Sequence, residues 1–513
     1  MKRIRNVLEA LVRRSPSLAS TLLISLSQEF WEKEGEHLAL SSFYETAEKV
    51  PAYRDFLLKH GLENYKHVKT IEDFKEMVPV MDKENYVKRY PLDQRSIKKI
   101  YNTFAFTTSG GTTADPLLVN HAKNEFNSSD LKIWLYYLLG DLSKRILLIN
   151  SFAQGAWTGG VLSNFVFKAL AEDPKINVSI VTPGLNVELV IALIDTIGEF
   201  YDIVLLAGYP SFFRLVYYEG VKMGLDWDAH KLILMCSGES VVNLKHFFAH
   251  HFNINPFFEL LDIYSATEGG WMAFFTPLCN LIEGLYEQNP TYFGITGPAS
   301  FFQYNPMYVY LEELKGELLI TRDSSSVIMP VVRYKLSDAV KMYKYAEMEN
   351  IWRNHFDIEP RVTLKKGGFS KKIVKWPFCV VRGRSDQSII IMGANIHPDE
   401  LTYALNLVKD NLINNFKFGV EEDIEKRFVI YLELFPGVSI SPSDLPKVTK
   451  RYHDLVLENL SKINIDFNEV YRAVPTILDP IIKICVYGEE PFEDHHIRVK
   501  PKHLLNGNTG NGN

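Results

Sequence analysis

The strongest constraint on the fold is a series of five short apolar runs, separated by segments of helical length. The runs are Ile146 to Ile149, Val178 to Val181, Ile203 to Leu206, Leu232 to Met235 and Leu260 to Ile263. Apolar strands that alternate with helices form a buried parallel sheet through right-handed βαβ crossovers. We therefore predict an α/β fold. Each run is followed by small, polar or glycine residues, so we expect ligands at the carboxyl ends of these strands.

The segments on either side of this region have different patterns. Residues 38–78 have helical spacing of apolar residues, the chain beyond Pro298 is rich in strand-like runs, and an α+β pattern begins near Arg382. We predict a helical N-terminal extension (1–37), a large domain with the parallel sheet and a strand-rich subdomain (38–385), a small α+β domain (386–505) and a disordered Asn/Gly-rich tail (506–513).

Charge and cysteine content restrict the partners and the compartment. The 513 residues include 56 Lys and Arg and 62 Asp and Glu, which gives a net charge of -6 without a long basic run, so nucleic acid is not an expected partner. The four cysteines lie at least 43 residues apart, which matches neither a disulfide scaffold nor paired zinc ligands. These features predict a cytoplasmic protein.

The first 27 residues begin with basic side chains and contain a short apolar run from Leu18 to Leu26. The run lacks a small-x-small cleavage pattern, so we expect two amphipathic helices that pack on the body, not a signal peptide. Weak docking on a membrane surface is the alternative interpretation.

A hydroxyl-rich and glycine-rich loop, TTSGGTTADP, spans Thr107 to Pro116. Gly110 and Gly111 allow backbone amides to turn toward one anion, and the threonine hydroxyls can donate further hydrogen bonds, which suits a polyphosphate. It is not a Walker A loop, because Ala114 and Asp115 stand where that motif would place a cation. A flexible hairpin without a ligand has the same composition.

Four later blocks follow this loop in a fixed order: CSGES (Cys236 to Ser240), DIYSATEGG (Asp262 to Gly270), GELLIT (Gly316 to Thr321) with RYKLSD (Arg333 to Asp338), and VRGRSDQ (Val381 to Gln387). The succession resembles the adenylate-forming superfamily of acyl- and aryl-CoA synthetases. FYETAEKVPAYRDFLLKHG (Phe43 to Gly61), FAQGAWTGG (Phe152 to Gly160) and AGYPSFF (Ala207 to Phe213) are similar to its phenylacetate-CoA ligase and capsule-biosynthesis-like branch. The likeness extends from about Leu40 to Leu505.

The resemblance implies an AMP-forming ligase that activates a carboxylic acid with ATP and Mg²⁺ and transfers the acyl group to coenzyme A. In that family the large domain binds nucleotide and acid, and the small domain is a mobile cap that would turn about Asp386. Thr267 would contact the α-phosphate, Glu268 would hold Mg²⁺, and Lys500 would be the catalytic cation. Nucleotide binding would fall to residues of the loop, the strand ends and the domain junction: Ser109, Gly110, Gly111, Thr112, Thr113, Ser237, Gly238, Glu239, Tyr264, Ser265, Asp338 and Arg384.

Each of these assignments has a plainer alternative. A strand-end tyrosine such as Tyr264 commonly packs in the core, a Thr-Glu pair can cap a helix, and an aspartate such as Asp338 can serve only a turn. Lys502 competes with Lys500, and Pro501 departs from the family pattern.

The acyl pocket is expected to be aromatic or apolar, from bulky residues of the matched segments near strand ends. These are Phe152, Trp157, Tyr209 and Phe212, which could equally be plain core.

Three functional interpretations remain open. The first is the CoA ligase, and the second is an adenylating enzyme that passes the acyl group to an amine, a carrier-protein thiol or a protein cysteine. The third is a nucleotide-binding homologue with degraded catalysis, suggested by Ala114 and Asp115. The histidines lack metal-ligand spacing, and a Ser-His-Asp hydrolase has no support. A homodimer is compatible with the sequence, and extended membrane contact is not expected.

Overall fold

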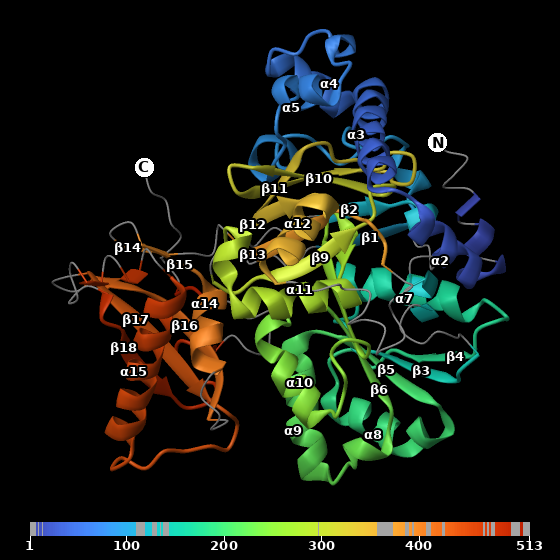
Figure 1. Cartoon of the computed structure of the whole chain (residues 1–513). Helices are drawn as coiled ribbons and strands as arrows, with labels where there is room; N and C mark the ends of the chain where they lie inside the picture. Colours follow the sequence, from blue (N-terminus) through green and yellow to red (C-terminus); the bar gives the residue numbers. More distant parts are fainter. Residues whose placement is uncertain are drawn as a thin grey trace. The chain divides into compact units, whose positions relative to one another are not determined.

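A computed structural model covers the chain (Figure 1). It describes residues 7, 8, 10–12, 14–108, 118–125, 131–133, 135, 136, 143–295, 297–356, 373–384, 389–391, 394–406, 412–422, 426–464, 467, 468, 471, 472, 478–493 and 503–505. The chain divides into two compact units. Unit 1 comprises Met1–Tyr292, Phe301–Leu336 and Lys341–Val380, and unit 2 comprises Phe293–Ser300, Ser337–Val340 and Val381–Asn513.

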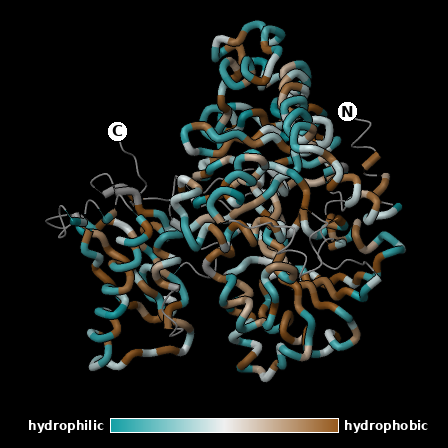
Figure 2. The backbone as a smooth tube through the Cα atoms, in the orientation of Figure 1, coloured by the Kyte–Doolittle hydropathy of each residue, from teal (hydrophilic) through white to brown (hydrophobic). Residues whose placement is uncertain are grey.

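The predicted parallel strands are present and lie side by side in unit 1 (Figure 1). Strands β4, β3, β5, β6 and β7 are neighbours in that order and all pair in parallel. Their bounds are β3 (Ile146–Asn150), β4 (Val178–Val181), β5 (Ile203–Gly208), β6 (Leu232–Ser237) and β7 (Leu260–Ala266). Every residue of β3, β5 and β6 is buried, as expected for strands covered on both faces, and Figure 2 shows hydrophobic segments in this region.

Helices connect these strands, and local sequence signals fix where they begin and end. They are α7 (Thr158–Ala171), α8 (Val187–Ile197), α9 (Pro210–Met223) and α10 (Lys245–His251). The side chain of Asn186, which precedes α8, accepts from the Leu189 amide. Helix α9 begins with Pro210 and is followed by Gly224, whose φ of 84° is left-handed. A proline in the first turn and a glycine after the last turn are typical helix boundaries.

The strand-rich region continues the same sheet, so that eleven described strands share the order β10-β11-β12-β13-β9-β8-β7-β6-β5-β3-β4. The join is antiparallel, because β8 pairs antiparallel with both β7 and β9. The added strands are β8 (Gly270–Phe274), β9 (Ser300–Tyr304), β10 (Val309–Leu314), β11 (Glu317–Arg322), β12 (Tyr334–Tyr343) and β13 (Phe378–Arg384). Helices α11 (Pro277–Gln288) and α12 (Tyr345–His355) interrupt this succession.

The helical front end packs on the strand-rich part of unit 1. It consists of α2 (Pro16–Ser25), α3 (Gln28–Lys49), α4 (Pro51–Lys59) and α5 (Ile71–Met77). Helix α3 contacts β10 and β11, and it is continuous through residue 38, where the sequence suggested a domain start. Arg333 caps the C-terminal end of α5, because its guanidinium donates to the carbonyls of Phe74, Lys75 and Val78. The same guanidinium forms an ion pair with the buried Glu312.

A separate two-stranded hairpin of unit 1 brackets the hydroxyl-rich loop. Its strands are β1 (Ala105–Thr108) and β2 (Leu118–His121), paired antiparallel from Ala105 opposite His121 to Thr108 opposite Leu118. Thr108 also forms a bridge with Trp157, at the start of α7. This bridge connects the end of β1 to the residue that precedes α7, the helix that follows β3.

Unit 2 has its own α+β core. Its described elements are β14 (Ile389–Ile391), β15 (Ala394–Ile396), α14 (Pro398–Asn406), β16 (Ile413–Glu422), β17 (Lys426–Leu434), α15 (Leu445–Ile463) and β18 (Ile481–Cys485). Strand β17 lies between antiparallel β16 and parallel β18, and buried apolar side chains of α14 and α15 belong to the same core cluster as β16 and β17. Leu504 adds a bridge to Phe418 of β16.

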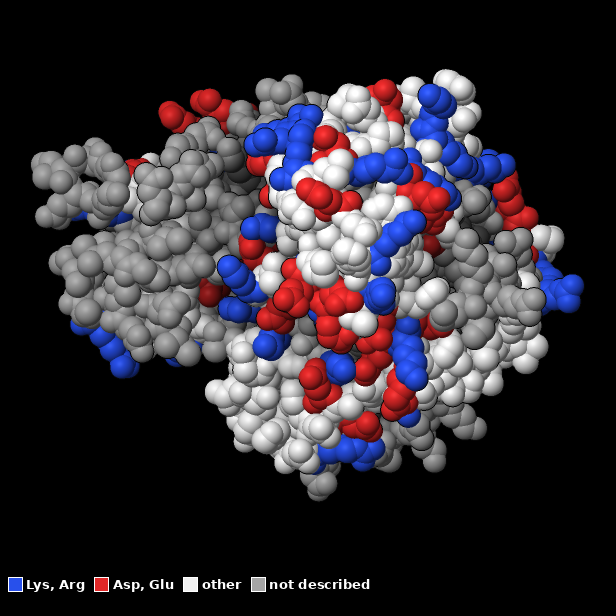
Figure 3. Space-filling view, turned by 90° about the horizontal axis from the view of Figure 1, so that it is seen from above, with Lys and Arg blue, Asp and Glu red and all other residues white. Residues whose placement is uncertain are grey.

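Two further features concern the distribution of charged side chains on the surface and the hydropathy of the helices. On the face shown in Figure 3, acidic and basic side chains are interspersed, without a continuous basic surface among the described residues in view. No helix in the described ranges combines the length and the hydropathy needed to span a bilayer.

Candidate functional site

The carboxyl ends of the parallel strands come together along one edge of the sheet. The parallel register places Asn150 opposite Ala207, Gly208 opposite Cys236 and Ser237 opposite Ile263. The polar segments that follow β3, β5, β6 and β7 are therefore neighbours in space. This is the edge at which ligands bind in open α/β sheets.

Ser237 and Ser265 link the ends of β6 and β7. The Ser237 hydroxyl lies 2.8 Å from the Ile263 carbonyl oxygen and 2.7 Å from the Ser265 hydroxyl. The next residue, Gly238, has a φ of 85°, a left-handed conformation that favours glycine. The backbone thus turns sharply directly after a buried strand, which leaves the Gly238–Glu239 segment at the sheet edge.

Tyr264 presents a half-buried ring at the end of β7. The ring stacks on Phe302 of β9, with a centroid separation of 5.5 Å and an interplanar angle of 26°. Phe302 is buried, and its ring covers one face of the Tyr264 ring. A planar base could stack on a ring held in this way. No sequence pattern indicated Phe302, which lies 38 positions further along the chain.

Glu268 lies in the turn between β7 and β8 and is oriented by a buried tyrosine. The Tyr334 hydroxyl donates to Glu268 Oε1 at 2.9 Å. Burial raises the pKa of Tyr334, and the neighbouring Glu268 carboxylate raises it further, so the phenol stays protonated and acts as a donor. Thr267 is half-buried beside Glu268 in the same turn. Tyr334 belongs to the RYKLSD block, but sequence alone did not reveal its contact with Glu268.

Two of the predicted acyl-pocket residues are in direct contact. The rings of Phe152 and Tyr209 meet edge to face at 5.2 Å, and both are buried. A Cβ added to Gly159 would lie 3.4 Å from the Tyr209 hydroxyl oxygen, so the absence of a side chain at Gly159 leaves space beside both rings. Burial raises the pKa of Tyr209, as does the carboxylate of Glu239. Phe212 is buried on the first turn of α9, and Trp157 is half-buried before α7.

Asp338 has an unexpected acidic neighbour within unit 2. Asp399, near the start of α14, has its pKa raised to about 6 by burial and by the charge of Asp338. Ser337 precedes Asp338 with a φ of 60°, which is an uncommon conformation for serine. Two carboxyl groups close together favour retention of a proton on one of them. The sequence blocks contained no signal for Asp399.

Several predicted residues lie outside the described part of the chain. They are Ser109, Gly110, Gly111, Thr112, Thr113, Asp386, Lys500 and Lys502. Arg384 is the last residue of β13, and only its backbone is described.

Glu268 is a carboxylate at the sheet edge that suits a hydrated cation. Among the described residues, no group of three or more His, Cys, Asp or Glu could enclose a metal ion. Mg²⁺ bound with a nucleotide needs only one or two carboxylates, because phosphate oxygens and water complete its shell. Glu268, fixed by Tyr334, is compatible with that mode.

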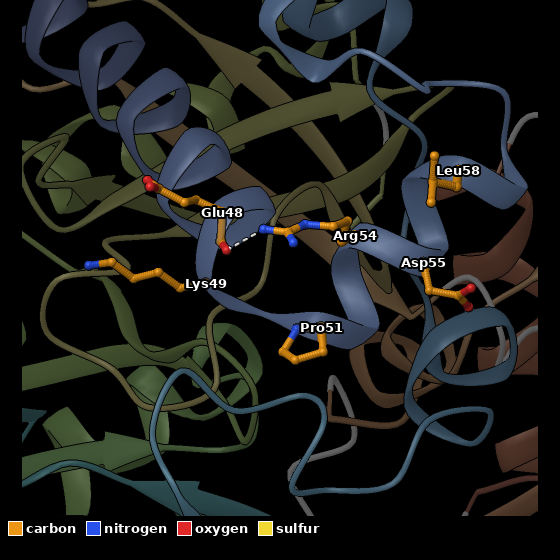
Figure 4. A pocket seen from close by; sticks show the side chains of 6 residues that line it. All are labelled: Glu48, Lys49, Pro51, Arg54, Asp55 and Leu58. Carbon is orange, nitrogen blue, oxygen red and sulfur yellow. Dashed lines mark hydrogen bonds between the residues drawn. The ribbon is translucent and has the colours of Figure 1, made fainter.

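A shallow hollow of about 260 Å³ lies at the elbow between α3 and α4 (Figure 4). Glu48, Lys49, Pro51, Arg54, Asp55 and Leu58 line it. The Arg54 guanidinium donates to the Glu48 carbonyl at 2.6 Å, which braces the elbow. None of the predicted site residues that the structure describes is among these lining residues.

Comparison with known proteins identifies the fold. No family model matches the sequence, and no curated protein matches it. A solved structure of 2-hydroxyisobutyryl-CoA ligase in the postadenylation state, in complex with 2-HIB-AMP, is similar with a TM-score of 0.66 and 14% identity, over 94% of this chain and 90% of the ligase. The acyl acid amido synthetase AtGH3.15, in complex with 2,4-DB, is similar with a TM-score of 0.52 and 14% identity, over 90% of each chain. The protein therefore has the fold of adenylate-forming ligases.

Proposed function

We propose that this protein activates a carboxylic acid with ATP, releases pyrophosphate, and transfers the acyl group from the acyl-adenylate to coenzyme A. The observation that carries the proposal is Glu268, held by Tyr334 in the turn that follows the Tyr264–Phe302 stack. The fold also supports the proposed function, because a CoA ligase whose structure was solved with an acyl-AMP has a similar fold. We also assign nucleotide binding to the residues named for it in the sequence analysis, and contact with the α-phosphate to Thr267.

In the first half-reaction, a carboxylate oxygen attacks the α-phosphorus and the bond to the bridging oxygen breaks, so that pyrophosphate leaves. Tyr264 orients the adenine by stacking, and the Gly238–Glu239 backbone borders its edge. Glu268 would hold Mg²⁺, which when bound neutralises phosphate oxygens that gain charge as pyrophosphate departs. Since two anions must meet, this catalysis consists mainly of orientation and charge placement.

In the second half-reaction, the thiol attacks the acyl carbonyl and AMP departs with one oxygen of the original carboxylate. We assign the mobile cation of the first step to Lys500, with Lys502 as the alternative, and the cap hinge to Asp386. Lys500→Ala should then abolish pyrophosphate formation and leave thioester formation from supplied acyl-adenylate largely intact. Equal loss of both half-reactions would contradict this assignment.

An aromatic or apolar acid is the proposed substrate, in line with the phenylacetate-CoA ligase-like blocks of the sequence. The buried pair of Phe152 and Tyr209 supports this substrate class, because the two rings offer apolar walls beside Gly159.

The second candidate function is transfer of the acyl group to an amine instead of a thiol. The similarity to an acyl acid amido synthetase over 90% of the chain favours this candidate.

The test is a screen of carboxylic acids for pyrophosphate release, with coenzyme A, an amine or no acceptor. Glu268→Gln should reduce pyrophosphate release by about 10²- to 10³-fold, as removal of a preorganised charged group does. The matched control is Glu63→Gln, because Glu63 is exposed and lies in the helical front end. Release from no acid in the wild-type protein would refute the function and favour a nucleotide-binding role.

A further inference from the structure

Arg95 is a buried cation without an anionic partner among the described residues. It is 6% exposed. Its Nε donates to the Tyr90 carbonyl at 2.9 Å, and its Nη1 lies 3.4 Å from the sulfur of Met329, which is a weak acceptor. The other terminal nitrogen, Nη2, makes no hydrogen bond within the described part of the chain. The guanidinium fork, which suits two oxygen atoms of one anion, is therefore largely unused.

Arg333 shows how the same chain compensates another buried guanidinium. Arg333 is 4% exposed, lies 3.2 Å from a carboxylate oxygen of Glu312, and donates to carbonyls at the end of α5. Burial lowers the pKa of Arg95, and the groups that oppose this shift are the phenols of Tyr86 and Tyr334. A guanidinium stays charged at physiological pH, and a buried charge without a counter-charge is strongly destabilising. Arg95 therefore indicates that an anion binds beside it.

A second polar group without a partner lies near Arg95. The Tyr86 hydroxyl is buried, and it has no hydrogen-bond partner in the ranges that the structure describes. Burial raises the pKa of Tyr86, and the charge of Arg95 opposes that rise. The Tyr86 ring packs against Phe56 and Tyr90, with centroid separations of 5.4 and 5.2 Å, so its position is fixed. An oxyanion near Arg95 could accept hydrogen bonds from both the hydroxyl and the guanidinium.

The segment that contains Arg95 is attached to the chain around the start of β12. Met81 forms a parallel bridge with Tyr334, the first residue of β12. Further along, the Ile97 amide donates to the Ile328 carbonyl at 2.8 Å. Arg95 lies between these two attachments in sequence and contacts the same stretch of chain through Met329.

Tyr334 connects Arg95 to the proposed Mg²⁺ ligand. The Tyr334 hydroxyl donates to Glu268 Oε1 at 2.9 Å. Burial raises the pKa of Tyr334, Glu268 and Asp82 raise it further, and Arg95 lowers it. Charges influence a pKa strongly only at short range, so Arg95 and Glu268 lie in the surroundings of one phenol. The unpaired cation is therefore close to the carboxylate that would hold the metal of MgATP.

We propose that Arg95 and the Tyr86 hydroxyl form a binding subsite for the β- and γ-phosphates of ATP, next to Glu268. The inference rests on the proposed function. A triphosphate needs cations, and the hydroxyl-rich segment 107–116 includes neither Lys nor Arg. Arg95 would donate to two phosphate oxygens through Nη1 and Nη2, and Tyr86 would donate to a further one. Pyrophosphate carries the same two phosphate groups, whereas AMP lacks both, so the subsite should distinguish these ligands.

The experiment measures the binding of MgATP, magnesium pyrophosphate and AMP to the full chain by calorimetry, without a carboxylic acid. Arg95→Met should weaken MgATP and pyrophosphate by about ten- to a hundredfold, because charge-assisted hydrogen bonds are lost. Tyr86→Phe should weaken the same two ligands by about two- to tenfold, because one neutral donor is lost. AMP should bind to both variants within about twofold of wild type, which a merely structural role of Arg95 would not predict.

The matched control is Tyr53→Phe. The Tyr53 hydroxyl is also buried and has no hydrogen-bond partner among the described residues, and its ring packs against Tyr86 at a centroid separation of 6.3 Å. The cation that acts on the pKa of Tyr53 is Arg333, not Arg95. Tyr53→Phe should therefore leave pyrophosphate affinity unchanged. Urea unfolding is the second measurement: magnesium pyrophosphate should raise the midpoint of the wild type and of Tyr53→Phe, and raise that of Arg95→Met much less.

Two results would overturn the subsite. Unchanged affinity of Arg95→Met for MgATP and pyrophosphate would mean that Arg95 does not contact these phosphates. An equal loss of AMP affinity would mean that Arg95 supports the fold instead of the ligand. If Arg95→Met does not fold, Tyr86→Phe decides, because unchanged pyrophosphate affinity in that variant would overturn the inference by itself.

The proposed function fails in a different way. A wild-type protein that binds MgATP and pyrophosphate, but releases pyrophosphate with no acid, would refute the proposed function and leave the subsite in place. Wild-type activity with unchanged ligand affinity in both variants would refute the subsite alone. A wild-type protein that binds neither MgATP nor pyrophosphate would contradict both.

Discussion

Asp262 lies in the interior of β7, two residues before Tyr264, and is 2% exposed. Burial raises its pKa to about 8, the nearby Lys245 opposes this rise, and Glu283 adds to it. Lys245 of α10 and Glu283 of α11 form an ion pair beside it. At neutral pH we therefore expect Asp262 to be a protonated, neutral side chain in the folded protein.

This raised pKa makes stability depend on pH in a definite direction. An aspartate in the unfolded chain loses its proton near pH 4, whereas folded Asp262 keeps its proton up to about pH 8. Between these values the folded state binds one more proton, so the free energy of unfolding falls as pH rises, by about 1.4 kcal/mol per pH unit. From pH 5 to pH 7 the loss from this group is about 2.5 to 3 kcal/mol.

The assay is urea unfolding of the wild type and of Asp262→Asn at pH 5, 6 and 7, with the transition of unit 1 followed. Asparagine keeps the shape of a neutral aspartate, so the variant should lose that part of the pH slope. Asp195→Asn is the control, because Asp195 is exposed on α8. Identical pH slopes for the wild type and Asp262→Asn would refute the reasoning, since they would mean that Asp262 is ionised when folded.

Three further predictions concern the site and its support. Tyr334→Phe removes the donor to Glu268 and should slow pyrophosphate formation by about tenfold or more in a single-turnover assay, and an unchanged rate would show that Glu268 needs no orientation. Gly159→Ala narrows the space beside Tyr209 and should shift acid preference toward smaller acids in kcat/KM comparisons; an unchanged preference would place the acyl group elsewhere. Arg333→Met leaves the buried Glu312 carboxylate and the carbonyls of Lys75 and Val78 without their donor, so urea unfolding should show a loss of about 3 to 5 kcal/mol, and a loss under 1 kcal/mol would contradict that role.

Local sequence signals were sufficient for the parallel part of the fold. The five predicted strands match β3 to β7 within a few residues, because apolar runs bounded by glycine, proline and polar residues mark fully buried strands. The extension of the same sheet by β8 to β13 was not predicted. That extension depends on pairing between strands distant in sequence, such as β13 with β9, and no local pattern encodes such pairing.

The same distinction applies to the candidate site. Residues at strand ends, such as Tyr264 and Glu268, could be located because parallel strands bring their carboxyl ends to one edge. Their supporting partners could not, because Phe302 and Tyr334 come from other strands and contact the site only through the tertiary fold.

The fate of one oxygen atom tests the central claim most directly. With a carboxylic acid labelled with ¹⁸O in its carboxyl group, mass spectrometry of the AMP released in the presence of coenzyme A should show one ¹⁸O, because the attacking carboxylate oxygen stays on the α-phosphorus. Unlabelled AMP, or release of ADP and phosphate in its place, would contradict activation of the acid as an acyl-adenylate.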